Sequence, residues 1–193
     1  MPEWLNYLKD QFVLNFIDDN RWKYLLNGLG VTLEITFFAV IIGIAIGIVV
    51  AIIRSTYDKT IDSVRPGLSR IFLSVLNAIC RVYLTVIRGT PVVVQLLITY
   101  FLIFVSSSNG VFVAIITFGI NSGAYVAEIF RSGIMSIDAG QTEAGRSLGF
   151  NYVQTMRYII IPQAFKNVLP ALANEFIVLL KETSVAGYVA VQD

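Results

Sequence analysis

Long runs of apolar residues alternate with short polar segments along most of this chain. The run from Ile35 to Ile53, ITFFAVIIGIAIGIVVAII, carries no charge and is long enough to cross the roughly 30 Å hydrocarbon core of a bilayer as a helix. Gly43 and Gly47 are four residues apart in this run. They share one helical face, which either packs closely against a second helix or simply tolerates two small residues. Glu34 precedes the run and is expected at the membrane interface.

A second apolar run, Ile71–Val105, is too long for one simple crossing and is interrupted by Arg88–Pro91. Proline removes a backbone donor and clashes with the preceding turn, so a kink is expected at Pro91. We therefore predict a first part that faces the cytoplasm and a crossing formed by Val92–Val105.

Two further apolar runs complete the pattern. The turn sequence Ser106–Gly110 separates the second run from a third predicted crossing, Val111–Phe130, and Val168–Leu180 is a short fourth candidate. The polar segment Arg54–Arg70 carries more Lys and Arg than acid. Because short basic loops stay in the cytoplasm, we expect this loop inside and the N-terminus outside.

The N-terminal segment, residues 1–24, mixes charged and aromatic residues and predicts an extracytoplasmic or interfacial helix. Trp4 and Trp22 suit the headgroup region of a membrane. Apolar residues recur near helical spacing and give one face of an amphipathic helix: Leu5, Leu8, Phe12, Phe16 and Ile17.

Composition supports lipid as the solvent. The chain of 193 residues is 56% hydrophobic and 14% charged, whereas soluble domains are about 45–50% apolar and about 25% charged. The net charge of +1 and the lack of a basic tract give no sign of nucleic-acid binding. Cys80 is the single cysteine and histidine is absent, so neither a catalytic site nor a metal site is predicted.

Polar residues inside the apolar runs are candidates for a translocation path. Asn121, Tyr125 and Glu128 are spaced four and three apart, so they share one helical face. Polar groups at membrane depth face either a water-filled path or another helix through hydrogen bonds, and the spacing does not separate these alternatives. The remaining candidates are Gln95, Asn174, Glu175 and Lys181.

The segment from residue 131 to residue 166 is far longer than a simple connection requires. Asp138 and Gln141 have the spacing of a capping box that would start a helix, and Gly149 stands where a glycine of positive φ would end it. Asn151 and Gln154 have the spacing to cap a second helix. The pattern predicts a rigid helical hairpin outside the bilayer.

The first helix of this hairpin carries groups suited to contact with a partner. Glu143 and Arg146 are three residues apart and can pair weakly, while Ala144 and Leu148 form an apolar edge. Ala144 and Gly145 are small and would permit close approach by another surface. We expect this helix to dock a cytoplasmic partner.

The same passage resembles the cytoplasmic loop of permease subunits in ATP-binding-cassette importers. That loop carries an EAA motif, here Glu143-Ala144-Gly145, followed by Gly149 and Pro162. The form PQAFKNVLPALANEFIVLLKETS is similar to the polar amino-acid permease family in particular. Further matches are NGLGVTLEIT (Asn27–Thr36), RGTPVVVQL (Arg88–Leu96) and NSGAYVAEIFRSGI (Asn121–Ile134).

The resemblance implies an all-α integral membrane protein that forms a helical bundle. The family core has five crossings and this sequence shows about four, so the resemblance implies that the chain is incomplete at its C-terminus. Residues 25–193 would form the transmembrane domain, with a coupling loop at 131–166. The glycine at position 145 departs from the family's alanine and should loosen the helix by about 1 kcal/mol. The implied ATPase-coupling residues are Gln141, Glu143, Ala144, Gly145, Leu148 and Gly149.

By the same resemblance, this chain is the permease of a bacterial cytoplasmic-membrane importer for polar amino acids, with the EAA loop in the cytoplasm. It lacks the G-x-x-x-x-G-K-[ST] loop that holds ATP phosphates. ATP and Mg²⁺ would bind separate ATPase subunits, and this chain would bind no cofactor. A second permease chain and an extracellular solute-binding protein are the other implied partners. An importer of another small solute and an ATP-independent secondary transporter are the alternatives.

Overall fold

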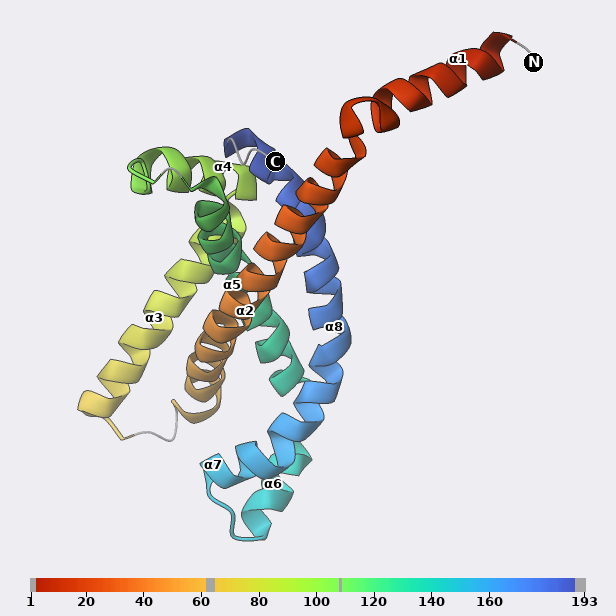
Figure 1. Cartoon of the computed structure of the whole chain (residues 1–193). Helices are drawn as coiled ribbons and strands as arrows, with labels where there is room; N and C mark the ends of the chain where they lie inside the picture. The colour runs from red at the N-terminus through yellow and green to blue at the C-terminus, as the bar shows by residue number, and fades with distance from the viewer. Residues whose placement is uncertain (1–2, 62–64, 108, 190–193) are drawn as a thin grey trace.

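The computed structural model describes residues 3–61, 65–107 and 109–189, and within these ranges the chain forms helices and no strand. Figure 1 shows a bundle of long helices, with one helix projecting from one end and a small hairpin at the other. The projecting helix is α1 (Glu3–Phe12), and the hairpin consists of α6 (Ala139–Ser147) and α7 (Tyr152–Thr155). The all-α prediction is confirmed.

The bundle is built on α2 (Trp22–Thr60), α3 (Leu68–Gly89), α5 (Gly110–Met135) and α8 (Ile161–Glu182). Within the described ranges, α2, α3 and α5 are long and apolar enough to cross a membrane. The charged residues of α8 lower its hydropathy, so a fourth crossing stays a prediction. The shorter elements are η1 (Val13–Ile17), η2 (Asp18–Asn20), α4 (Val92–Ile98), η3 (Thr99–Ile103), η4 (Met156–Ile160) and η5 (Thr183–Val189).

Helix α2 extends well beyond the predicted crossing Ile35–Ile53. It covers 39 residues, about 58 Å at 1.5 Å per residue. The prediction of a loop beginning at Arg54 was wrong, because the helix continues to Thr60. Polar side chains mark where a helix leaves the hydrocarbon, but this stretch contains no glycine or proline to end the helix.

The break predicted at Pro91 is present, but the crossing was assigned to the wrong side of it. Helix α3 ends at Gly89, Thr90 is extended, and α4 starts at Val92. The apolar helix Val92–Ile103 is about 18 Å long at 1.5 Å per residue, which is less than the roughly 30 Å hydrocarbon core. The span-length helix is therefore α3.

The glycines of α2 are a packing face. A Cβ added to Gly43 would stand 2.9 Å from Ser122 Oγ, and one added to Gly47 would stand 2.5 Å from Val126 Cγ1. On the facing helix α5, Gly123 packs in turn against Ile46 of α2. The two helices thus interlock at a crossing that only small residues allow, and close packing is the alternative that the structure supports.

Buried residues tie the four bundle helices into two cores. One core joins α2, α4, α5 and α8 and includes Ile35, Leu96, Phe118 and Leu179. The other joins α2, α3 and α5 through buried residues including Val50, Cys80, Leu84 and Ala124. Outside these two cores, many large apolar side chains on the bundle surface are exposed.

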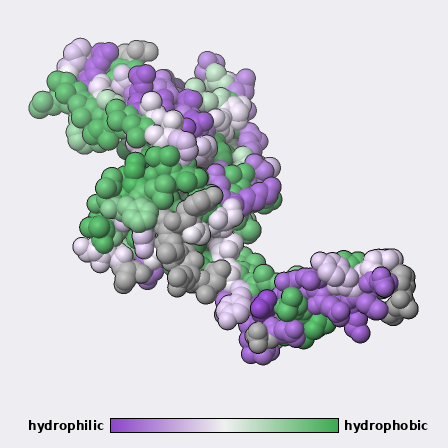
Figure 2. Space-filling model, turned by 90° about the horizontal axis from the view of Figure 1, so that it is seen from above, coloured by the Kyte–Doolittle hydropathy of each residue, from purple (hydrophilic) through white to green (hydrophobic). Residues whose placement is uncertain are grey.

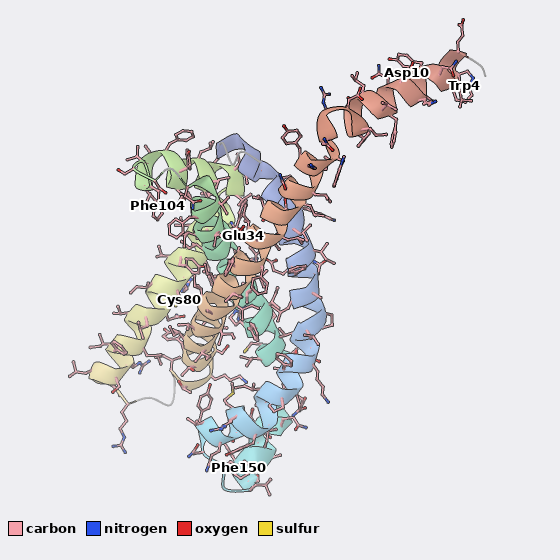
Figure 3. The ribbon with its side chains drawn as sticks, in the orientation of Figure 1. Trp4, Asp10, Glu34, Cys80, Phe104 and Phe150 are labelled. Carbon is pink, nitrogen blue, oxygen red and sulfur yellow. The ribbon has the colours of Figure 1, made fainter. Side chains whose placement is uncertain are left out.

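Figure 2, seen from above, shows broad hydrophobic surfaces on the bundle and a more hydrophilic projecting arm. Exposed apolar side chains on α3 include Val75, Ile79 and Val82. Figure 3 places Phe150 on the hairpin, at the opposite end of the molecule from Trp4 and Asp10 on α1. A bundle with an apolar exterior and polar ends suits a membrane environment.

Candidate functional site: a helical hairpin and a polar cavity

The α6–α7 hairpin begins at the predicted N-cap. Asp138 Oδ1 accepts a hydrogen bond from the backbone N–H of Gly140 at 2.8 Å. The reciprocal contact expected from Gln141 is replaced by another: Gln141 Oε1 accepts from Gln163 Nε2 of α8 at 3.3 Å. Gln141 therefore ties the hairpin to α8 instead of closing a capping box.

The corner of the hairpin forms as predicted. Gly149 has φ +82°, a left-handed conformation that favours glycine. Asn151 and Gln154 make the full capping box, with both side-chain-to-backbone hydrogen bonds at 2.9 Å. Local chemistry alone therefore determines where α6 ends and α7 begins.

Gly145 faces the inside of this hairpin. It is buried in α6, and an added Cβ would stand 2.8 Å from Thr155 Cγ2 and 3.0 Å from Ile159 Cδ1. The sequence led us to expect a partner protein close to Gly145, but the residue that lies against it is Thr155 of α7 in the same chain. The other five predicted coupling residues are exposed on the hairpin: Gln141, Glu143, Ala144, Leu148 and Gly149.

The hairpin also meets the end of α2. Tyr152 of α7 and Lys59 of α2 line one cavity of about 380 Å³, together with Glu143 and Arg146 of α6. Burial raises the pKa of the Tyr152 hydroxyl, an effect that the nearby Thr56 side chain partly opposes. A neutral Tyr152 therefore packs between the hairpin and the long α2 helix.

A polar cavity of about 580 Å³ lies between α5 and α8, with Arg88 of α3 at its wall. It brings together three of the predicted path residues, Tyr125, Glu128 and Glu175. Glu175 Oε1 accepts a hydrogen bond from Ser122 Oγ at 3.0 Å, which orients the carboxylate. The remaining lining residues are Ile129, Ser132, Gly133, Ser136, Asn167, Val168 and Ala171.

Glu128 is the centre of an ion-pair cluster that joins α2, α3 and α5. Its Oε2 accepts from Arg131 Nε at 2.9 Å, and its Oε1 lies 3.6 Å from both Arg54 Nη1 and Arg88 Nη1. Arg131 also reaches Asp58 Oδ2 of α2 at 3.5 Å. The Arg88 guanidinium carbon lies 5.5 Å from the centre of the Tyr125 ring, a cation–π distance.

Gln95 and Asn121 serve helix packing. Asn121 Nδ2 donates to Gln95 Oε1 at 3.1 Å. Gln95 Nε2 donates to the carbonyl oxygens of Ile87 at 2.7 Å and Thr90 at 2.9 Å. These bonds satisfy backbone acceptors at the break before α4, where the helical hydrogen bonds stop. For this pair, the alternative of interhelical hydrogen bonding is the one observed.

Asn174 and Lys181 lie apart from the other candidates. Both are exposed on α8, and neither lines the polar cavity.

The sequence did not predict a role for Arg54, Arg88 and Arg131, whose side chains gather at Glu128. The signal available for Arg88 was its spacing of seven from Arg81 on a helix, which places both on one face.

The chain matches a known protein family in sequence. The family described as the binding-protein-dependent transport system inner membrane component matches residues 43–193. The chain belongs to this family. It is therefore a multi-pass membrane permease.

Individual relatives agree with this assignment. The permease is 37% identical over 173 residues to the arginine transport system permease protein ArtQ of Bacillus subtilis (strain 168), covering 88% of this chain and 72% of ArtQ. It is 34% identical over 181 residues to the L-cystine transport system permease protein TcyB of the same organism, covering 93% and 71%.

Solved structures are similar in fold. An amino acid ABC transporter crystallised with histidines superposes with a TM-score of 0.75 at 36% identity, covering 100% of this chain and 79% of the other. The MetNI methionine ABC transporter in an inward-facing conformation gives a TM-score of 0.73 at 22% identity, covering 91% and 79%. The second likeness concerns the fold alone.

Proposed function

We propose that this permease forms the translocation path for polar amino acids in an importer driven by ATP hydrolysis on a separate subunit. The observation that carries the proposal is the likeness, at 36% identity over the whole of this chain, to an amino acid ABC transporter. The relatives named for arginine and L-cystine transport support the same substrate class.

The polar cavity supports this function chemically. An amino acid carries an ammonium group and a carboxylate, and the cavity wall offers the Glu175 and Glu128 carboxylates together with the Arg88 guanidinium. Tyr125 adds an aromatic face. A zwitterion entering this space would find a partner of opposite charge for each end. In this proposal, Tyr125, Glu128 and Glu175 line the path.

The α6–α7 hairpin is the proposed point of contact with the ATPase. Its exposed Glu143, Ala144 and Leu148 would meet a cleft of that subunit, while the corner at Gly149 keeps the two helices at one angle. Because Tyr152 packs at the end of α2, movement of the hairpin would be transmitted to that helix. ATP and Mg²⁺ would act on the ATPase, and this chain would bind no cofactor.

The proposed assembly contains two permease chains, two ATPase subunits and an extracellular solute-binding protein. Residues 25–193 would form the transmembrane domain of a bacterial cytoplasmic-membrane protein. Residues 1–24 would form an extracytoplasmic or interfacial segment. The N-terminus would lie outside, and the hairpin would lie in the cytoplasm.

Reconstitution of the importer in liposomes tests the proposal. The permease, its ATPase and its solute-binding protein are assayed for uptake of radiolabelled amino acids, with an ATPase variant that cannot hydrolyse ATP as the control. Uptake that requires both ATP and the binding protein is expected. ATP-independent uptake would indicate a secondary transporter, and ATP-driven uptake of a different solute class would overturn the amino-acid assignment.

A further inference from the structure

We propose that Arg81 and Arg88 of α3, together with Arg54 of α2, bind the carboxylate group of the transported solute. This inference rests on the proposed function, because it takes the solute to be an amino acid. It adds the recognised chemical group and the residues that recognise it.

The first observation is a polar stripe along α3. Its members are spaced by three or four residues and therefore share one helical face: Arg70, Ser74, Asn77, Arg81, Thr85 and Arg88. A different face of the same helix exposes Val75, Ile79, Val82 and Val86. Since an apolar face suits lipid and a row of arginines does not, the stripe is directed toward protein or water.

The depth of the stripe follows from its neighbours. Cys80 and Leu84 of α3 pack with Val50 of α2 and Ala124 of α5. Val50 lies inside the uncharged run Ile35–Ile53. The α3 turn that carries Arg81 therefore lies within the membrane, where a guanidinium group needs a water-filled cavity or an anion.

Such a cavity is present. A space of about 430 Å³ is lined by Arg54, Arg81 and Arg88, with Glu128 as its one acidic lining residue among those described. The other lining residues are Leu84, Thr85 and Gly89. The cavity is thus strongly cationic.

The local charges do not balance. The guanidinium groups of Arg54, Arg88 and Arg131 pair with the carboxylates of Glu128 and Asp58. The guanidinium group of Arg81 shares the cavity with Glu128, which makes four cations to two anions. The shortest of these contacts joins Arg131 Nε to Glu128 Oε2 at 2.9 Å. Within the described part of the chain, Arg81 makes no ion pair. An anion would neutralise this excess.

Hydrogen-bond donors also remain available. Arg54 and Arg88 each stand 3.6 Å from the same oxygen of Glu128, beyond the usual 2.7–3.2 Å of an N–H···O bond. The Nε of Arg54 is buried and has no acceptor in the part of the chain that the structure describes. Buried donors are normally paired, and planar guanidinium groups match a carboxylate with two parallel bonds.

The position of the cavity favours a solute over a lipid phosphate, which offers similar chemistry. Arg88 and Glu128 line both this cavity and the polar cavity that contains Tyr125 and Glu175. A carboxylate held by the arginines would leave the amino group of the same molecule on the side of Glu175. The arginines would then favour solutes that carry a free carboxylate.

Equilibrium binding to the detergent-solubilised importer, without nucleotide or solute-binding protein, tests this inference. The probes are a radiolabelled transported amino acid and its amide, in which the carboxylate is neutral. Arg81→Gln and Arg88→Gln are expected to weaken binding of the acid by roughly 10–100-fold and to abolish the preference for the acid over the amide. Arg70→Gln is the matched control, since it removes the same charge from the same stripe outside the cavity.

The outcomes are separable. Equal weakening of acid and amide, or unchanged binding in both variants, overturns the carboxylate role. An effect that appears only when anionic lipid is added to the detergent micelles assigns the arginines to a lipid phosphate and also overturns it. Should Arg88→Gln not fold, Arg81→Gln decides, because Arg81 makes none of the cluster's ion pairs. Failure of the wild-type importer to transport any amino acid would instead reject the proposed function.

Discussion

Gly145 of α6 lies against Thr155 of α7 so closely that a Cβ at position 145 would stand 2.8 Å from Thr155 Cγ2 and 2.9 Å from its Oγ1. Close packing against Thr155 therefore explains why position 145 is a glycine and not the alanine of the EAA motif. It lets the two short helices of the hairpin touch.

Gly145→Ala is expected to destabilise the hairpin, although alanine favours a helix over glycine by about 1 kcal/mol. Overpacking a buried contact costs about 1–3 kcal/mol, which offsets that gain. Faster protease cleavage within residues 139–160 of the purified importer would report the loss.

Thr155→Ala supplies the matching control for Gly145→Ala. Among the described residues, the buried Thr155 hydroxyl has no hydrogen-bond partner, so the gain from removing it should partly offset the roughly 1 kcal/mol lost with the buried Cγ2 methyl. In the double variant, the added methyl at position 145 gains the space of the lost side chain, and cleavage should return toward the wild-type rate. A single Gly145→Ala variant as resistant as the wild type would contradict the packing argument.

Gly149→Val is expected to lower transport per ATP hydrolysed while leaving membrane insertion intact. Forcing a residue with a Cβ into the left-handed region at φ +82° costs about 1–2 kcal/mol, so the corner would open and change the angle of α6. Parallel measurement of uptake and phosphate release checks this. Gly30→Ala is the control, since an added Cβ there meets no atom within 4 Å; equal losses in both variants would argue against a role for the corner.

Gly47→Ala should loosen the α2–α5 crossing. The new methyl would stand 2.5 Å from Val126 Cγ1 and 2.9 Å from the backbone nitrogen of Ala127, and overpacking of this kind costs about 1–3 kcal/mol. A lower thermal unfolding temperature in detergent is expected. Val126→Ala in the same chain should recover part of the loss, and no recovery would mean that the contact with Ala127 dominates.

Glu128→Gln is expected to lower stability by about 1.5–3 kcal/mol, the usual value of hydrogen bonds to charged groups. It leaves Arg54, Arg88 and Arg131 facing one another without their shared anion. Asp58→Asn should cost less, because within the described residues Asp58 makes one ion pair, with Arg131 at 3.5 Å. Thermal unfolding of the two variants provides the measurement, and a larger loss for Asp58→Asn would reject Glu128 as the centre of the cluster.

The sequence by itself was sufficient for features that depend on neighbours within one turn. The corner at Gly149, the capping box of Asn151 and Gln154, and the break at Pro91 were all predicted and are all present. Each depends on backbone conformations that a few adjacent residues decide. Apolar runs likewise predicted α2 and α5, although polarity at Arg54 was mistaken for the end of a helix.

Tertiary structure decided what those elements contact. Gly145 meets Thr155 across the hairpin, and Gln95 of α4 pairs with Asn121 of α5. Arg54 and Arg88 come from two different helices, α2 and α3, and meet at Glu128 of a third helix. Helical periodicity gives the face on which a side chain lies, but the partner of that face depends on how distant helices cross, which is set by close packing at sites such as Gly47 and Val126.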